Sequence, residues 1–368
     1  MRKMFVVAIA AAMTLTLGAC ASSSDNSSNS GSGIKIGFIY VSPLKGSGWT
    51  TAWDQTRKSL ETDFNATTSA VEPIPETADC VGVLKNLISK GNKIIFATAF
   101  GYQPFVAQVA TENPKVTFAV IGPWAQKEAP PANVSVISND SWATRYALGV
   151  LAANMTKTKT LGFVAANPIP SVIASINAFE LGARSVDPTI KTRAVFTGTW
   201  YDPARATQAA QSLAQAGADV IAQYEDSTGT LLGAQKANVL GIGSEVDSST
   251  VLPDTYLSGS VNDWHAFAKK LVQSVTDGSY QQINEVGTIA SGVAALGAIS
   301  PKVPADVKAK VEKTLAGLSD NSIVPFSGPL KSNTGKELLK PGEQWKDSVT
   351  VFGKQTFLVE GVIGKIPG

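Results

Sequence analysis

The sequence predicts an α/β protein made of two Rossmann-like lobes with parallel sheets, joined by a hinge. The chain has 368 residues, and a single hydrophobic core seldom grows past about 250–300 residues. Short runs rich in Ile, Val and Phe alternate with Ala-rich amphipathic stretches of helical length, which is typical of a parallel sheet covered on both faces. This alternation starts twice, each time with a strand, a Gly/Pro-bearing loop and a helix. We therefore expect two lobes of similar plan.

The two series of elements can be placed along the chain by their apolar patterns. The first series contains residues 34–40, 93–100 and 116–122 as strands and 49–64, 81–91 and 104–114 as helices. The second contains residues 160–167, 192–198, 219–224 and 238–247 as strands and 173–185 and 203–217 as helices.

Two further segments are expected to connect the lobes. The apolar and small residues of 138–158 fit a helix that leads out of the first lobe, and 256–261 reads as a strand that crosses back. We expect one lobe to contain 34–145 with part of 262–325, and the other to contain 155–258 with part of 300–368. In such an arrangement a ligand binds in the cleft where both sheets present the carboxyl ends of their strands.

The N-terminus precedes this pattern and predicts export. Arg2 and Lys3 give a basic start, and residues 5–17 are apolar but too short and Ala-rich for a spanning helix. We interpret 1–19 as a signal peptide. The sequence LGAC at 17–20 resembles the lipobox of bacterial lipoproteins, which implies that Cys20 becomes lipidated and anchors the mature chain at the extracytoplasmic face of the cell membrane.

The Ser/Asn/Gly-rich stretch after Cys20 is predicted to be a flexible tether that reaches to residue 33. Its composition cannot bury enough apolar surface to fold. At about 5–6 Å × √n it has an average reach of about 20 Å. The folded lobes would therefore stay close to a membrane surface.

Charge and composition exclude several classes of function. Removal of residues 1–19 takes away two cations and no acid, so 29 basic side chains face 29 acidic ones. A neutral chain offers no electrostatic footprint for nucleic acid. Only Cys80 remains once Cys20 carries lipid, and His265 is the single histidine. We therefore expect no intrachain disulfide, no metal site, no cofactor and no enzymatic activity.

Several motifs resemble the basic membrane protein (BMP) family of bacterial substrate-binding lipoproteins. They are IGFIYVSPLKGSGWTTAWDQTRKSLE near the start, NAFELGARS and TWYDPA in the middle, GIGSEVD after them, and FSGPLKSNTGKELLKPGE near the end. The resemblance covers nearly all of residues 34–368. It implies a fold similar to type I periplasmic binding proteins, an ABC permease as partner, and a purine nucleoside or nucleobase as ligand.

Two tryptophans are the first candidates for ligand contacts. Trp49 lies in GSGW, after the first strand, where glycines allow the backbone to approach a ligand closely. Ser47 of the same loop is a further candidate for a ligand contact. Trp200 follows the end of strand 192–198, and Asp202 is the expected N-cap of the next helix. Each indole could instead pack in a core. If each belongs to a different lobe, closure would sandwich a planar ligand between them.

Polar and aromatic candidates follow other strands. Asp247 ends GIGSEVD, Tyr224 and Glu225 follow the strand residues DVIAQ at 219–223, and Tyr102 follows strand 93–100. Each could instead be an ordinary turn or surface residue. Trp264, after the crossover strand, could wall the cleft or pack at the hinge.

One departure from the family pattern bears on the ligand. Many BMP proteins carry an acidic residue before the Gly-aromatic pair and Asn after it, where this chain has Ser47 and Thr50. Loss of the acidic residue removes one expected contact to the base or ribose. The ligand could therefore be a compact nucleobase as well as a nucleoside. A sugar on the same scaffold, or a nucleoside-processing enzyme, are the alternative interpretations.

Overall fold

The computed structural model describes residues 33–368, which form one compact unit. The predictions of a signal peptide, of lipidation at Cys20 and of a tether concern residues 1–33 and lie almost wholly outside the described residues. No helix within 33–368 is long and apolar enough to cross a membrane.

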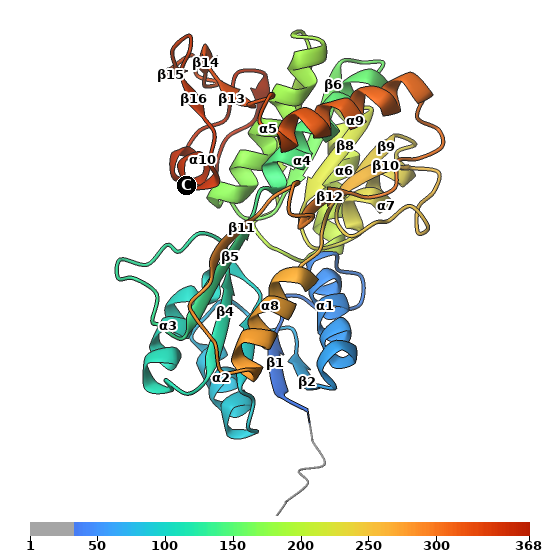
Figure 1. The fold of residues 1–368 in the computed structure, drawn as a ribbon. Coiled ribbons are helices and arrows are strands. Elements are labelled where there is room, and N and C mark those ends of the chain that lie inside the picture. Colours follow the sequence, from blue (N-terminus) through green and yellow to red (C-terminus); the bar gives the residue numbers. More distant parts are fainter. Residues whose placement is uncertain (1–32) are drawn as a thin grey trace, which may run out of the picture. The chain divides into compact units, whose positions relative to one another are not determined.

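The first lobe contains a six-stranded sheet with strand order β11-β5-β4-β3-β1-β2, in which all pairs are parallel (Figure 1). Its central strands β1, β3, β4 and β5 are buried almost throughout, as their continuous apolar runs require, while the edge strands β2 and β11 are partly exposed. The strands of this sheet are β1 (Lys35–Ile39), β2 (Thr67–Val71), β3 (Ile94–Ala97), β4 (Thr117–Ile121), β5 (Val134–Asn139) and β11 (Asn284–Gly287). Its helices are α1 (Trp49–Phe64), α2 (Asp79–Ser89), the 3₁₀ turn η1 (Phe100–Tyr102), α3 (Gln103–Glu112) and α8 (His265–Thr276).

The second lobe contains a seven-stranded sheet with order β12-β10-β9-β8-β6-β7-β17, parallel except for β12. Its strands are β6 (Thr160–Ala165), β7 (Lys191–Phe196), β8 (Val220–Tyr224), β9 (Leu240–Glu245), β10 (Tyr256–Asn262), β12 (Ala294–Leu296) and β17 (Val362–Ile363). Its helices are α4 (Ser141–Met155), α5 (Pro170–Val186), α6 (Pro203–Gln215), α7 (Gly229–Lys236) and α9 (Ala305–Ser319). The predicted fold class, two parallel-sheet lobes, is confirmed.

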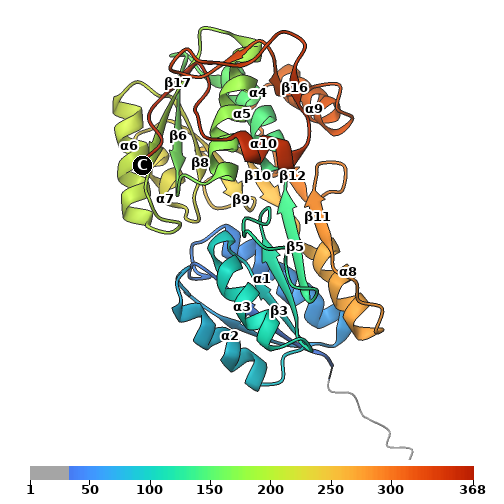
Figure 2. The ribbon, with the colours of Figure 1, turned by 90° about the vertical axis from the view of Figure 1, so that its left-hand side faces the viewer.

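The last fifty residues pack on the second lobe and form two short antiparallel strand pairs and a helix. The pairs join β13 (Phe326–Ser327) with β16 (Gln344–Trp345), and β14 (Leu330–Lys331) with β15 (Glu337–Leu339). Helix α10 (Ser348–Lys354) follows, and β17 then adds to the edge of the large sheet. Figure 2 shows α10 between the large second-lobe helices and the first lobe.

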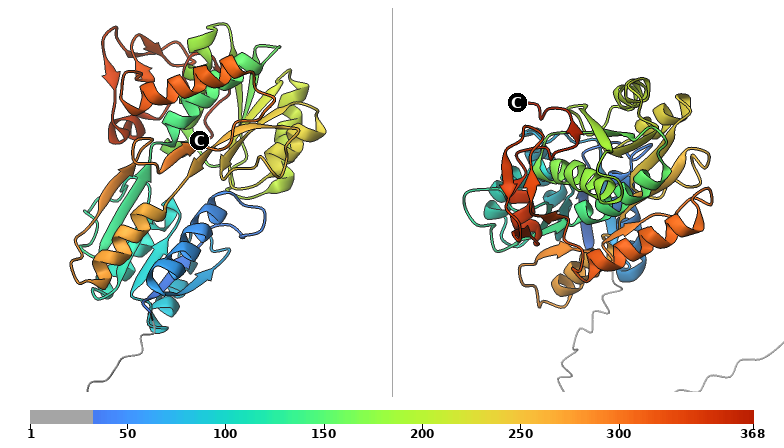
Figure 3. Two further views of the ribbon diagram at one scale, coloured as in Figure 1. Left: turned by 45° about the vertical axis from the view of Figure 1, so that its right-hand side comes forward. Right: turned by 90° about the horizontal axis from the view of Figure 1, so that it is seen from above.

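The chain passes between the lobes three times, after β5, after β10 and after β11 (Figure 3). At these crossings the Asn139 Nδ2 donates to the Asn262 Oδ1 at 2.6 Å, which joins β5 to β10. Both side chains are buried, so the bond is protected from water.

Helix α4 is held tightly to the second lobe, against α5, α9 and β10. A Cβ at Gly149 would lie 2.0 Å from the Phe179 carbonyl oxygen, and one at Gly182 would lie 2.0 Å from that of Tyr146. The two glycines therefore let the helix backbones touch. Residues 141–145, which the sequence analysis placed in the first lobe, begin this helix.

Helix α5 carries a buried carboxyl group at Glu180. Its Oε2 accepts a hydrogen bond from the Thr192 Oγ1 at 2.6 Å, and its Oε1 has no partner among the described residues. Burial raises the pKa of Glu180 to about 7, against the lowering effects of the Thr192 hydrogen bond and of the Arg184 and Lys191 charges.

We expect Glu180→Gln to stabilise the protein at pH 8 but hardly at pH 5. Because the folded-state pKa lies above the unfolded value, the wild type loses stability as pH rises from about 4.5 through 7. The neutral amide removes that loss, worth roughly 2 kcal/mol between pH 5 and 8. Urea unfolding at both pH values measures it. An equal difference between variant and wild type at the two pH values would contradict this assignment.

Candidate ligand-binding pocket

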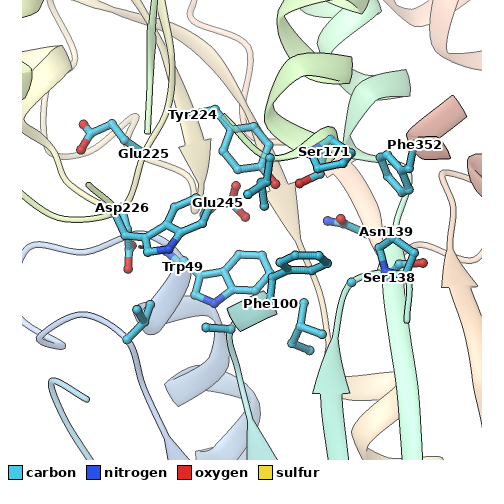
Figure 4. Close-up of a pocket in the computed structure, with 18 residues that line it drawn as sticks. Trp49, Phe100, Ser138, Asn139, Ser171, Tyr224, Glu225, Asp226, Glu245 and Phe352 are labelled. Atoms are coloured by element: carbon cyan, nitrogen blue, oxygen red, sulfur yellow. Dashed lines mark hydrogen bonds between the residues drawn. The ribbon is translucent and has the colours of Figure 1, made fainter. Parts of the chain in front are cut away.

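A pocket lies between the carboxyl ends of the strands of the two sheets, with an empty volume of about 780 Å³ that includes its open mouth. Figure 4 shows side chains entering it from both lobes. The lining residues are Val41, Trp49, Ala99, Phe100, Ile121, Gly122, Pro123, Ser138, Asn139, Ile169, Pro170, Ser171, Trp200, Tyr224, Glu225, Asp226, Glu245 and Phe352.

Trp49 forms a braced platform on the first-lobe side of the pocket. It is the first residue of α1, so its side chain stands at the end of the helix that faces the second lobe. The indole Nε1 donates to the Thr98 carbonyl oxygen at 2.6 Å. Behind it, the Trp264 ring packs edge-on, with the ring centroids 5.4 Å apart. Trp264 also stacks on Trp53, with the ring centroids 4.9 Å apart. These contacts hold the indole in one orientation.

Trp264 therefore lies behind the pocket wall. Its side chain is fully buried and does not line the pocket. This arrangement corresponds to the hinge-packing alternative for Trp264, because the residue begins the segment that returns from β10 to α8.

Trp200 lines the pocket from the second lobe, in the loop between β7 and α6. Its Nε1 donates to the Glu76 Oε2 at 2.6 Å, and the Glu76 Oε1 accepts from the Gly101 backbone N–H at 2.6 Å. Glu76 thus ties this indole to the first lobe. Asp202 caps α6 as predicted, accepting from the Arg205 backbone N–H at 2.9 Å.

Two more aromatic rings complete the lining. Tyr224 ends β8 and lines the pocket as predicted, with the guanidinium of the buried Arg145 5.2 Å from its ring centre. Phe100 was missed by the sequence analysis, which chose Tyr102 from the same turn. Tyr102 is fully buried, and its hydroxyl donates to the Ile74 carbonyl oxygen at 2.5 Å, so it lies outside the pocket lining.

Three acidic residues also line the pocket, and all belong to the second lobe. Glu225 and Asp226 follow β8, and Glu245 ends β9. Burial raises the pKa of Glu225 to about 8 and that of Asp226 to about 7, and it raises that of Glu245 as well. No lysine, arginine or histidine is among the described lining residues. The pocket therefore suits a ligand that offers hydrogen-bond donors and carries no negative charge.

The carboxylate at the end of β9 is Glu245 and not the predicted Asp247. Glu245 has a φ of +72°, a left-handed conformation that is uncommon for residues other than glycine. Asp247 instead accepts hydrogen bonds from the Ser249 backbone N–H and Oγ, both at 3.0 Å, and does not line the pocket.

Glu245 is held by a buried polar network that reaches the hinge. Its Oε1 accepts from the Ser244 Oγ at 2.9 Å, and its Oε2 accepts from the Asn262 Nδ2. The Arg145 guanidinium lies 3.9 Å from the Oε1. Since Asn262 also accepts from Asn139 of the first lobe, the network links the pocket, the hinge and both lobes.

Hydrogen bonds across the mouth of the pocket join the lobes directly. The Asp226 Oδ1 accepts from the Trp49 backbone N–H at 2.6 Å, and its Oδ2 from the Thr50 Oγ1 at 3.3 Å. Asp226 thus caps a helix of the opposite lobe. Tyr201 donates to the Lys45 carbonyl oxygen at 3.0 Å. A Cβ at Gly48 would lie 2.8 Å from the Ser244 carbonyl oxygen, so the lobes approach closely here.

Ser47 lies in this loop but not in the pocket lining. Its side chain is buried, and its hydroxyl has no partner among the described residues. Of the predicted ligand contacts, the structure therefore brings Trp49, Trp200 and Tyr224 together at the pocket. Within residues 33–368, no group of three or more His, Cys, Asp or Glu side chains is placed to hold a metal ion.

Residues 34–324 match the family described as ABC transporter substrate-binding protein, PnrA-like, the Bmp family. The chain belongs to this family. The resemblance that the sequence motifs carried is thereby confirmed.

Two relatives align over most of the chain. A purine-binding protein of Brucella abortus is 33% identical over 336 residues, which is 91% of this chain and 94% of that protein. A Haloferax volcanii protein, whose name proposes glucose binding for an ABC transporter, is 28% identical over 91% of this chain and 81% of its own length.

Solved structures show the same fold. A solute-binding protein of an ABC transporter from Aeropyrum pernix superposes with a TM-score of 0.70 at 15% identity, over 87% of this chain and 96% of that protein. At this identity the likeness concerns the fold alone.

Proposed function

We propose that this Bmp-family protein is a lipid-anchored, extracytoplasmic binding protein of an ABC importer that captures a purine nucleobase or nucleoside. The observation that carries the proposal is the pocket between the two sheets, which combines aromatic rings from both lobes with three acidic residues of the second lobe. The purine-binding Brucella relative supports the ligand class. Lipidation at Cys20 would hold the lobes near the permease.

Aromatic stacking accounts for part of the binding energy. A base stacked on an aromatic side chain gains about 1–3 kcal/mol, so Trp49 and Trp200 together would contribute roughly 2–6 kcal/mol. A micromolar dissociation constant needs about 8 kcal/mol. Hydrogen bonds between a base or ribose and the polar groups of the pocket would supply the rest, since each contributes about 0.5–1.5 kcal/mol, and more where the carboxyl group is ionised.

Closure of the hinge makes binding detectable by the permease. A ligand shifts the balance between open and closed forms only by its difference in affinity for the two. A ligand that touches Trp49 of one lobe and Tyr224 of the other has that difference. The protein would bind and release its ligand unchanged, without catalysing a reaction.

A sugar is the second candidate, because the Haloferax relative is named for glucose. We expect a thermal-shift screen to show stabilisation by purine bases or nucleosides and none by glucose. Stabilisation follows RT ln(1 + [L]/Kd) and reaches about 2.7 kcal/mol at 100 times Kd. A response to sugars alone would overturn the purine proposal. Release of free base from inosine in proportion to added protein would overturn the proposal of binding without chemistry.

A further inference from the structure

We infer that Phe352 of α10 limits the length of the ligand, so that the pocket selects a purine base over the corresponding nucleoside. This inference rests on the proposed function and deepens it. It starts from the position of Phe352 in the pocket wall. Phe352 belongs to α10, a helix of the C-terminal segment that packs on the second lobe.

Helix α10 is fixed to the second lobe, so Phe352 is a firm wall. Asp347 caps the helix by accepting from the Thr350 backbone N–H at 2.8 Å. The Trp142 Nε1 of α4 donates to the Ser348 Oγ at 3.3 Å. Phe352 itself is 4% exposed and packs in the core of this lobe.

The chain after α10 is held by Asn177, a buried residue of α5. Its Nδ2 donates to the Gln355 Oε1 at 2.8 Å, and its Oδ1 accepts from the Val359 backbone N–H at 2.9 Å. The helix that carries Phe352 is therefore anchored at both ends.

The two ends of the pocket differ in how they are closed. In Figure 4, Asp226 and Glu225 lie at one end, and Phe352 lies with Ser138 and Asn139 at the other. The Asp226 end is closed by hydrogen bonds between the lobes. At the opposite end, the phenyl ring of Phe352 takes up space beside the polar groups of Ser138 and Asn139. A base held between the aromatic rings could extend a sugar only toward this end.

The test measures dissociation constants of adenine, adenosine, hypoxanthine and inosine by calorimetry for the wild type and Phe352→Ala. We expect the wild type to bind each base more tightly than its nucleoside. The alanine variant should shift the base-to-nucleoside affinity ratio at least 10-fold toward the nucleoside, because the removed ring leaves room and exposes the Ser138 and Asn139 groups. Phe352→Leu should shift the base-to-nucleoside ratio in the same direction but by less. This milder variant allows the same measurement if Phe352→Ala does not fold.

Val349→Ala is the matched control, because Val349 lies on the same helix and is 69% exposed. It should leave all four constants unchanged. If the Phe352 variants bind purines with an unchanged ratio, or weaken bases and nucleosides equally, Phe352 is a general wall and the inference is wrong. If the wild type binds none of the four compounds, the proposed function fails, and this inference fails with it.

Discussion

Replacement of Trp49 by alanine is expected to weaken ligand binding about 5- to 150-fold. The loss of one base-stacking contact costs about 1–3 kcal/mol, and each 1.4 kcal/mol is a tenfold change. The indole is braced by Trp264 and by its bond to the Thr98 carbonyl oxygen, so it is oriented before the ligand arrives. Calorimetric titration with the best purine from the thermal-shift screen measures the loss.

Trp345→Ala is the control for this substitution. Trp345 is also half-buried, but it packs against Phe326 and Phe357 and lies outside the pocket lining. We expect it to lower the melting temperature and to leave affinity unchanged. If Trp49→Ala behaved in the same way, Trp49 would be a core residue and not a platform.

Replacement of Asp226 by alanine is expected to weaken binding about 10- to 100-fold by destabilising the closed form. Asp226 makes two hydrogen bonds to the start of α1 in the other lobe, to Trp49 and Thr50. An open form cannot keep them, so their loss acts on closure. Each hydrogen bond contributes about 0.5–1.5 kcal/mol, so the two together contribute about 1–3 kcal/mol. Titration gives the affinity, and small-angle X-ray scattering gives the shape with and without ligand.

Two further variants serve as controls for Asp226→Ala. Asp226→Asn keeps an acceptor for the Trp49 backbone N–H and should lose less affinity. Asp219→Ala removes a carboxylate that accepts from the Thr156 Oγ1 and the Lys157 backbone N–H inside the second lobe, and it should affect stability alone. An Asp226→Ala protein that closes and binds like the wild type would show that the contacts across the mouth do not drive closure.

The sequence predicted the fold and part of the site because both follow from local pattern. Strand-helix alternation specified two parallel sheets, and the carboxyl ends of parallel strands meet at one edge. That rule located Trp49, Trp200 and Tyr224 at the pocket. It depends only on where a strand ends.

The missed residues depend on geometry that no local pattern reveals. Phe100 and Tyr102 share one 3₁₀ turn, and the side-chain directions in that turn decide which ring faces the pocket. Glu245 lines the pocket from a left-handed backbone conformation at the end of β9, two residues before the predicted Asp247. Asp226 caps a helix 177 positions away in the chain. Phe352 comes from a helix that follows the whole second sheet in sequence, apart from its last strand.

A crystal structure of the protein grown with adenine or adenosine tests the central claim most directly. We expect the purine ring between the two sheets, with one face against Trp49 of the first lobe and the other against Trp200 or Tyr224 of the second. We also expect its N–H groups to point at the Glu245 carboxyl group. A purine bound to the rings of one lobe only, or outside this pocket, would contradict the account.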